Sequence, residues 1–369
     1  MARIAVDTQE LVNKISVVSK VVPSKAIKPI LGCVLFDLNE DGVYLLASDL
    51  ETGVKARLNC EYEGFGRFAV DGKVLYEVVK TLPSDVGANL EITPTSLSIE
   101  CGRSKFKLSV VDPSDFPEVS LSESSVSFEI EAGVLHSMID RVIFCAATDE
   151  FMRNLNGIYW ELGNGFLRLV ASDGFRLALA EERLDIQTEE GLGFLLSLKS
   201  MKELMNVAQS CEGKSLRVEY DGKRIGILAT DVETLMRIVE VEFPDYKRVL
   251  PKAFKTKVVA STNDLVEALR RTMVIAKRGS ESIRVEVMEN TLVLSSRSPD
   301  FGEVSEELEV KKEGEDVIAA FNPKFLIEAL RRIETEEVEL NFIDSTSPLQ
   351  INPLEVEGYL YVVMPIRIV

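Results

Sequence analysis

The chain offers few residues whose types and spacing suit catalysis. Its single histidine, His136, leaves little for acid–base chemistry near neutral pH and argues against a histidine-rich metal site. Asp173 and Arg176 lie together in SDGFRL, but the related SDLETG at 48–53 indicates a repeated turn residue rather than a catalytic carboxylate. No P-loop, zinc-protease or serine-hydrolase motif occurs, and GLGFLL at 191–196 lacks the third glycine of a dinucleotide-binding loop. The sequence therefore predicts no catalysis, no metal and no cofactor.

The composition is that of an ordinary globular protein, with 369 residues, of which 46% are apolar and 28% charged. No apolar run approaches the roughly 18 residues that a membrane-spanning helix needs. The first residues show no basic stretch followed by an apolar one, so we expect no signal peptide and a cytoplasmic location. The five cysteines have no C-x-x-C spacing, which favours buried reduced thiols over disulfides or zinc: Cys33, Cys60, Cys101, Cys145 and Cys211.

The elements that would position any site come from a threefold internal repeat. Three strand-like segments recur at intervals of 124 and 125 residues: VYLLASD (43–49), LRLVASD (167–173) and LVLSSRS (292–298). Amphipathic helices recur in the same register, over 8–25, 71–82, 131–148, 197–209, 261–278 and 322–333. Near the module ends, SDFPEV (114–119) resembles EFPDYK (242–247). The repeat predicts an α+β fold with antiparallel sheets, in three modules over 1–125, 126–252 and 253–369.

Positive charge is concentrated on the predicted helices. The formal charges of these six segments total +6, which leaves −24 on the rest of a chain whose net charge is −18. At 100° per residue, Arg270, Lys277 and Arg278 share one side of their helix, and the apolar residues occupy the other. A solvated surface is one interpretation of this pattern; the other is a basic face for phosphates. We find no interleaving of basic and aromatic residues, so contact with nucleic acid would be non-specific and made to the backbone.

Several short strings, in order along the whole chain, resemble the bacterial DNA polymerase III beta subunit family, the replicative sliding clamps. They are KPILG (28–32), GRSKFKLS (102–109), DFP (115–117), LNG (155–157), ASDGFRLA (171–178), FPDYKRVLP (243–251), FN (321–322) and YVVMPIRIV (361–369). The resemblance implies a ring-shaped head-to-tail homodimer around duplex DNA, with the sheets outside and two helices of each module facing a central pore. It implies a non-catalytic processivity factor that tethers a polymerase.

The resemblance also implies a partner-peptide pocket between the second and third modules. The residues at the family's motif positions are Leu155, Ser172, Gly174, Phe175, Arg176, Leu177, Pro244, Arg248, Val249, Val362, Val363, Met364, Pro365, Ile366 and Arg367. Phe175 and Ile366 stand where some relatives have other residues, so peptide preference can differ. The implied partners are the DNA polymerase III alpha subunit, the clamp loader delta subunit, and other polymerases and repair proteins with clamp-binding peptides.

For the ring interface, the resemblance points to Phe106 meeting Val274 and Ile275. For DNA it points to Lys25, while the helical-face argument adds Lys73, Lys199, Arg270, Arg271, Lys277, Arg278, Lys324, Arg331 and Arg332. Two other functions stay open at this point. If the chain is a cleft hydrolase, a metal or substrate should change its melting temperature. If it is a scaffold without a DNA role, substituting the basic residues of the 261–278 helix should leave DNA loading unchanged.

Overall fold

A computed structural model describes residues 1–186, 188 and 191–367. The chain divides into two compact units, Met1–Gly133 with Lys202–Ile238 and Val134–Met201 with Val239–Val369. In the described residues, no helix is both long enough and apolar enough to cross a membrane. The helices are α1 (Thr8–Ser19), α2 (Gly72–Val79), α3 (Ala132–Ile143), α4 (Leu198–Ser210), α5 (Thr262–Ala276) and α6 (Pro323–Leu330).

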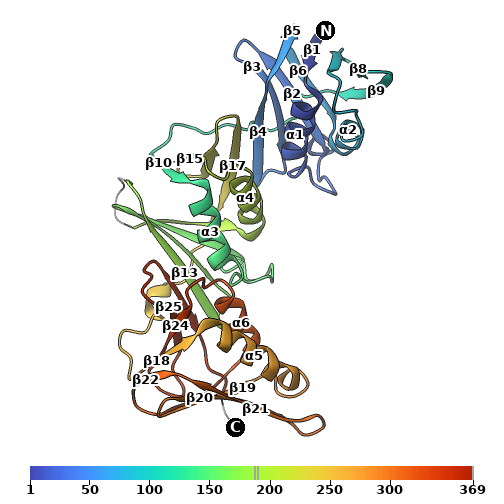
Figure 1. Ribbon diagram of the computed structural model, residues 1–369. Helices are drawn as coiled ribbons and strands as arrows, with labels where there is room; N and C mark the ends of the chain where they lie inside the picture. Colours follow the sequence, from blue (N-terminus) through green and yellow to red (C-terminus); the bar gives the residue numbers. More distant parts are fainter. Residues whose placement is uncertain (187, 189–190, 368–369) are drawn as a thin grey trace. The chain divides into compact units, whose positions relative to one another are not determined.

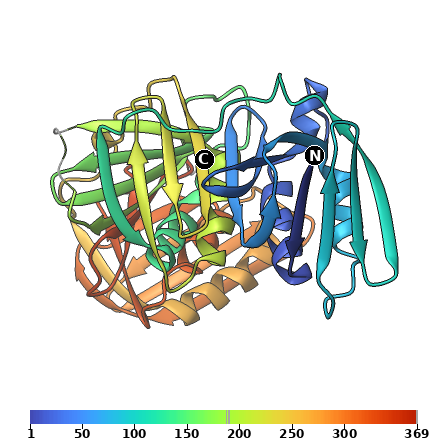
Figure 2. The same cartoon turned by 90° about the horizontal axis from the view of Figure 1, so that it is seen from above.

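Antiparallel strands make up the body of the first unit (Figure 1). One run of paired strands is β5–β1–β7–β8–β9, and a second is β6–β2–β3–β4–β17–β16–β15–β10. Figure 2 shows the β8–β9 hairpin at the edge of the first run. The strand bounds are β1 Ala2–Val6, β2 Cys33–Asn39, β3 Gly42–Ser48, β4 Thr52–Leu58, β5 Cys60–Glu63, β6 Gly66–Asp71, β7 Ala88–Ile92, β8 Ser96–Cys101, β9 Ser104–Val111, β10 Val126–Glu131, β15 Ser215–Tyr220, β16 Arg224–Leu228 and β17 Val232–Val239.

The second unit is also antiparallel. Its long run is β14–β11–β12–β13–β26–β25–β24–β18–β22, and a four-stranded sheet has the order β21–β20–β19–β23. The bounds are β11 Gly157–Gly163, β12 Phe166–Ser172, β13 Arg176–Arg183, β14 Leu192–Ser197, β18 Thr256–Ser261, β19 Ile283–Met288, β20 Thr291–Ser298, β21 Gly302–Glu309, β22 Lys311–Gly314, β23 Val317–Phe321, β24 Glu337–Phe342, β25 Leu349–Pro353 and β26 Tyr359–Val363. The predicted α+β class with antiparallel sheets is confirmed.

The repeat extends to the residues that begin the helices. The side chains of Asp71, Ser197 and Asn322 accept a backbone N–H at the first turns of α2, α4 and α6. Such caps satisfy donors that a helix cannot bond internally. The aspartates Asp49 and Asp173 are turn residues as predicted, because each carboxylate accepts two backbone N–H groups, from positions two and three residues ahead.

The helices bury the faces that their apolar spacing predicts. In α5, Leu265, Leu269 and Ala276 are buried against the strands beneath, and α5 lies beside α6 (Figure 1). In the first unit, α1 and α2 lie side by side on a core that includes Leu11 and Leu75. Burial of such side chains stabilises the fold by about 1.5–3 kcal/mol each.

Each unit contains one junction at which strands from neighbouring modules pair. In the first unit β4 pairs with β17, with Val54 opposite Thr234. In the second unit β13 pairs with β26, with Leu177 opposite Val362. Backbone hydrogen bonds thus run continuously across both junctions, and the second junction brings the SDGFRL turn next to the C-terminal strand.

Candidate functional site

A cavity of about 170 Å³ opens on the second unit where β13 meets β26. The SDGFRL turn forms one side, the C-terminal run forms another, and the segment that follows β17 forms a third. The lining is mostly apolar: Leu155, Ser172, Gly174, Phe175, Arg176, Leu177, Phe243, Pro244, Asp245, Tyr246, Val249, Val362 and Met364. Such a lining suits apolar side chains of a short ligand.

Ten of the fifteen residues predicted for the partner pocket line this cavity. The five that do not are Arg248, Val363, Pro365, Ile366 and Arg367. Arg248 is exposed and pairs with Asp245 at 2.9 Å, whereas Val363 is fully buried in the sheet. Ile366 and Arg367 line a different hollow. Residues Ile368 and Val369, at the end of the YVVMPIRIV string, lie outside the described residues.

The prediction missed Phe243, Asp245 and Tyr246, although the FPDYK string contains them. The ring of Phe243 stacks on Tyr159, with 4.9 Å between ring centroids and 9° between planes, so it faces inward beneath the cavity. Tyr246 is buried and starts a short 3-10 turn, Tyr246–Arg248. The signal that could have identified them is the repeat with DFP at 115–117, since a recurring aromatic next to proline favours a packed corner.

A polar network below the cavity holds this segment. The hydroxyl of Tyr246 donates to Glu161, and Lys247 Nζ donates to the other oxygen of Glu161 at 2.5 Å. Arg168 donates to Glu161 and to the Tyr246 oxygen, both at 3.0 Å. Burial raises the pKa of Glu161, but the hydrogen bonds from Lys247 and Tyr246 outweigh it, and the net pKa is lowered. The cavity wall is therefore anchored by an ionised, hydrogen-bonded carboxylate.

Arg176 lines the cavity, yet its charge is directed away from it. Its side chain is only 9% exposed, and its donors are occupied by Asp173 (3.0 Å), Glu328, and the backbone carbonyl of Phe144 (2.8 Å). Its guanidinium also lies over the ring of Phe325, 4.3 Å from the centroid. Burial lowers the pKa of Arg176, but the hydrogen bonds to Glu328 and Asp173 contribute to a net upward shift of that pKa. The cavity is thus suited to apolar groups rather than to a carboxylate.

The rim of the cavity is apolar and exposed. Phe175 is 62% exposed, Val249 48% and Met364 43%. The backbone N–H of Met364 donates to the Phe175 carbonyl at 2.8 Å, which ties two sides of the rim together. Exposed apolar groups gathered around a hollow are typical of a docking site.

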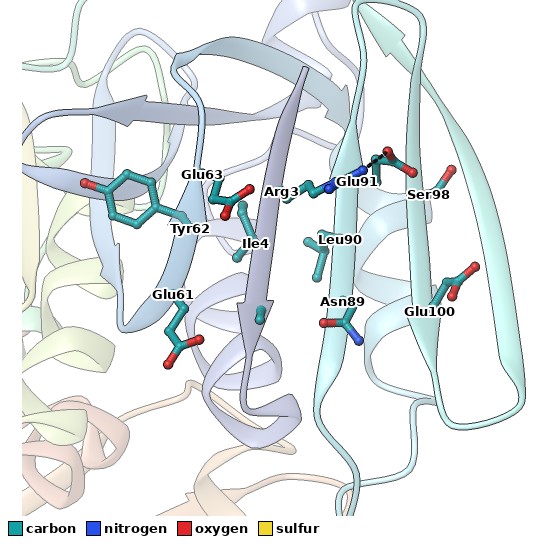
Figure 3. Close-up of a pocket in the computed structure, with 11 residues that line it drawn as sticks. Arg3, Ile4, Glu61, Tyr62, Glu63, Asn89, Leu90, Glu91, Ser98 and Glu100 are labelled. Atoms are coloured by element: carbon teal, nitrogen blue, oxygen red, sulfur yellow. Dashed lines mark ion pairs between the residues drawn. The ribbon is translucent and has the colours of Figure 1, made fainter.

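A second hollow, of about 630 Å³, lies on the first unit across β5, β1, β7 and β8 (Figure 3). Arg3 pairs with Glu91 at 3.6 Å, and Glu61 and Glu63 lie on the neighbouring strand (Figure 3). Among the described residues, no group of three or more His, Cys, Asp or Glu is placed to hold a metal ion. This hollow is a polar, solvated sheet face.

Comparisons with known proteins cover the chain from end to end. Family models of the DNA polymerase III beta subunit match as the N-terminal domain at 2–120, the central domain at 129–245 and the C-terminal domain at 247–367. The solved DNA polymerase III beta subunit of Thermotoga maritima is 52% identical, covers 100% of both chains and has a TM-score of 0.92. The chain belongs to the DNA polymerase III beta subunit family.

Two further relatives agree. The beta sliding clamp of Pseudomonas aeruginosa is 29% identical over 98% of this chain and 99% of its own. A crystal structure from the same organism is 28% identical, covers 99% of this chain and 100% of its own, and has a TM-score of 0.94. The chain is therefore a non-catalytic sliding clamp that confers processivity on DNA polymerase III, with three clamp domains. The cleft hydrolase considered from sequence is excluded.

Of the ten residues predicted to face DNA, five lie on helices, four follow directly after α5 or α6, and Lys25 lies in a loop; nine of the ten are exposed. Exposed positions are Lys25, Lys73, Lys199, Arg270, Arg271, Lys277, Arg278, Lys324 and Arg331. Lys73 Nζ donates to the Ser24 carbonyl at 2.8 Å, which places it beside Lys25. Arg271 donates to both carboxylate oxygens of Glu306, at 2.9 and 2.7 Å. The formal charge of a helix therefore overstates the charge it presents.

Arg332 differs from the other nine. Its Nε donates to the Asp140 carbonyl at 2.7 Å, and its guanidinium lies over Phe144, 4.3 Å from the ring centroid. Only 23% of its side chain is exposed, so the structure assigns it to packing between α3 and α6. Phe144, beyond the end of α3, covers part of the Arg332 side chain, so Arg332 presents less charge than its place on the predicted helix face suggests.

The predicted interface residues lie on β9 of the first unit and on α5 of the second. Phe106 is half-buried on β9, packed against the first core. Val274 is 63% exposed on α5, and Ile275 is half-buried beside it.

The five thiols are free: Cys33, Cys101, Cys145 and Cys211 are buried, whereas Cys60 is half-buried. Burial raises the pKa of Cys60 to about 11, and the charge of Glu10 adds to this, so the thiol stays protonated at neutral pH.

Proposed function

We propose that the cavity at the β13–β26 junction binds short linear peptides of this clamp's partners. The observation that carries the proposal is the mostly apolar lining with an exposed apolar rim of Phe175, Val249 and Met364. Leucine and phenylalanine side chains match such walls, and few polar groups are needed to fix the peptide.

The partners proposed are the DNA polymerase III alpha subunit, the clamp loader delta subunit, and other polymerases and repair proteins that carry such peptides. Clamp structures from Pseudomonas aeruginosa, 28% identical to this chain, include one with a ligand and one bound to griselimycin. These relatives support a ligand-binding surface in the family.

A fluorescent peptide with a leucine–phenylalanine core tests the pocket by polarisation. Met364→Glu places a charge on the rim, where a bound peptide would cover the unpaired carboxylate. Because such burial is costly, we expect binding to weaken at least about tenfold. Met288→Glu is the matched control, because Met288 is 45% exposed but lies outside the cavity lining. Equal affinity in the two variants would refute the pocket.

We propose further that two copies assemble head to tail through β9 and β21. In the described residues, 104–109 of β9 pair only with β8, and β21 pairs only with β20, so each presents a free edge. The two edges have complementary charge. Exposed Lys105 and Lys107 project from β9, and β21 carries Glu303, Glu307 and Glu309. Joining different surfaces of two copies can close a ring, and it would cover two strand edges that otherwise promote aggregation.

The proposed ring encloses duplex DNA, with exposed helix cations toward the phosphates. Contacts of this kind are non-specific and salt-sensitive, which permits sliding. The proposed module boundaries near 125 and 252 are supported by the family models, whose first two matches end at 120 and 245.

Light scattering tests the dimer, and retention on nicked circular DNA tests encirclement. Linearising the loaded DNA should release a ring from its ends without any change in salt. A monomer, or equal retention on linear and circular DNA, would refute the ring.

A further inference from the structure

A large basin of about 1060 Å³ lies on the four-stranded sheet β21–β20–β19–β23 of the second unit. The C-terminal run closes one side, because Ile366 N–H donates to the Ala320 carbonyl at 2.7 Å and extends the sheet beyond β23. The lining is Ser280, Ser282, Arg284, Ser295, Ser296, Arg297, Glu303, Val304, Ser305, Ala320, Ile366 and Arg367.

The basin is basic on a chain whose net charge is −18. Three arginines and one glutamate line it. Arg284 pairs with Glu286, whereas Arg297 and Arg367 make no ion pair within the described part of the chain. Two guanidinium groups are thus available to an anion.

Serine hydroxyls complete an arrangement suited to oxyanions. Ser295 lies between Arg284 and Ser305 in the register of the three strands, about 5 Å from each. Hydroxyl and guanidinium donors together match a carboxylate, which accepts several hydrogen bonds at once. None of the described residues that line the basin is aromatic, so they offer no platform for stacking a nucleobase.

The C-terminal run contributes residues to both the peptide pocket and the basin. Met364 lines the pocket, and Ile366 lines the basin only two residues later. Two extended residues span at most about 7 Å. A peptide anchored in the pocket therefore reaches the basin with its next few residues.

We propose that this basin binds the carboxylate side chains of acidic residues that flank the apolar core of a partner peptide. The inference rests on the proposed peptide-binding function and adds the chemistry of the flanking segment. Arg297 and Arg367 supply the charge, and Ser295 and Ser305 supply neutral donors. Only peptides with an acidic flank would contact the basin arginines, since the apolar core binds in the pocket. The basin would therefore distinguish partner peptides by their flanking residues.

Fluorescent peptides with one apolar core test the proposal. The core is extended by glutamates, serines or lysines, at the N-terminal end in one series and at the C-terminal end in the other. At about 50 mM NaCl, glutamates at one end should bind about three- to tenfold tighter than serines, as expected for two exposed charge pairs. Lysines at that end should bind more weakly, and the differences should disappear near 0.5 M NaCl.

The double variant Arg297→Ala with Arg367→Ala should bind the glutamate and serine peptides equally. Arg183→Ala is the control, since Arg183 is an exposed arginine outside the basin. Equal affinity of glutamate and serine peptides for the native chain, or a glutamate advantage that survives in the double variant, overturns the basin proposal alone. Failure of the serine peptide to bind the native chain overturns the pocket itself.

Discussion

The contact between Glu328 and Arg176 offers the sharpest test of how the pocket is held in shape. Glu328 lies on α6, whereas Arg176 starts β13 and lines the cavity. Their side chains form a direct ion pair in which Arg176 is 9% and Glu328 29% exposed. Substituting Glu328→Ala would leave a guanidinium N–H without its charged acceptor in a mostly buried place.

The expected cost follows from that burial. A hydrogen bond between charged groups contributes about 1.5–3 kcal/mol to the free energy of unfolding. A buried donor left without an acceptor lowers that free energy further. Arg176 keeps two other acceptors, Asp173 and the Phe144 carbonyl, and water can reach part of the site. We therefore expect a loss of about 2 kcal/mol in the free energy of unfolding, which is about 4–8 °C in the melting temperature of a unit this size. Glu328→Gln, which keeps an acceptor, should cost about half as much.

Peptide affinity should fall as well, because a displaced Arg176 disturbs the cavity wall. About 1 kcal/mol of lost preorganisation corresponds to about fivefold weaker binding. The control is Glu334→Ala, an exposed glutamate just beyond α6 that makes no ion pair within the described residues. The assays are thermal unfolding and peptide polarisation on the same samples. If the Glu328→Ala and Glu334→Ala variants have the same melting temperature and the same peptide affinity, α6 does not position the pocket and the reasoning is wrong.

Three further outcomes are expected. Val274→Glu should shift the light-scattering mass from dimer toward monomer, whereas Val356→Glu, at another exposed apolar position, should not. Lys277→Glu with Arg278→Glu should lower the amount of clamp loaded onto nicked circular DNA without changing peptide affinity; unchanged loading would remove these two residues from the proposed DNA surface. Glu161→Gln should reduce the decrease in the free energy of unfolding that the native chain shows at acid pH, as measured by urea unfolding. The folded pKa of Glu161 is lowered, so its contribution is complete above its unfolded value of about 4.3 and lost as pH falls through the folded pKa. Parallel pH curves for the variant and the native chain would contradict the network.

The fold could be predicted in its outline because local signals repeat. Segment 197–209 becomes α4, Leu198–Ser210, since Ser197 caps it and apolar spacing continues through it. The first helix was predicted too long: α1 ends at Ser19, where the chain turns toward Pro23. Periodicity alone does not register such an ending, because Val21 and Val22 keep the apolar spacing.

The sequence shows how many charges the helices carry, but it does not show which of those charges are already held in ion pairs. Lys14 counts toward the positive charge of its helix, yet it is 7% exposed and its amine donates to Asp231. These residues are 217 positions apart in sequence. Ion pairs across such separations depend on tertiary packing, so a sum of formal charges cannot reveal them.

The two module junctions repeat the same strand pairing but differ in what fills the space beside it. At the β4–β17 junction, Gly53 occupies the position that Leu177 occupies at the β13–β26 junction, 124 residues later. A Cβ on Gly53 would approach Val119 Cγ1 to 2.9 Å, so Val119 fills the space directly. Val119 is itself buried in a core with Phe116.

At the second junction, the matching segment bears Phe243 and Tyr246, 127 residues after Phe116 and Val119. Tyr246 turns its hydroxyl down to Glu161, and Phe243 stacks on Tyr159. Both rings are buried. The space beside Leu177, which corresponds to the space that Val119 fills beside Gly53, therefore stays open. The same backbone repeat therefore yields a filled core where a small residue meets valine, and a cavity where Glu161 and Tyr159 hold the two aromatic side chains inward.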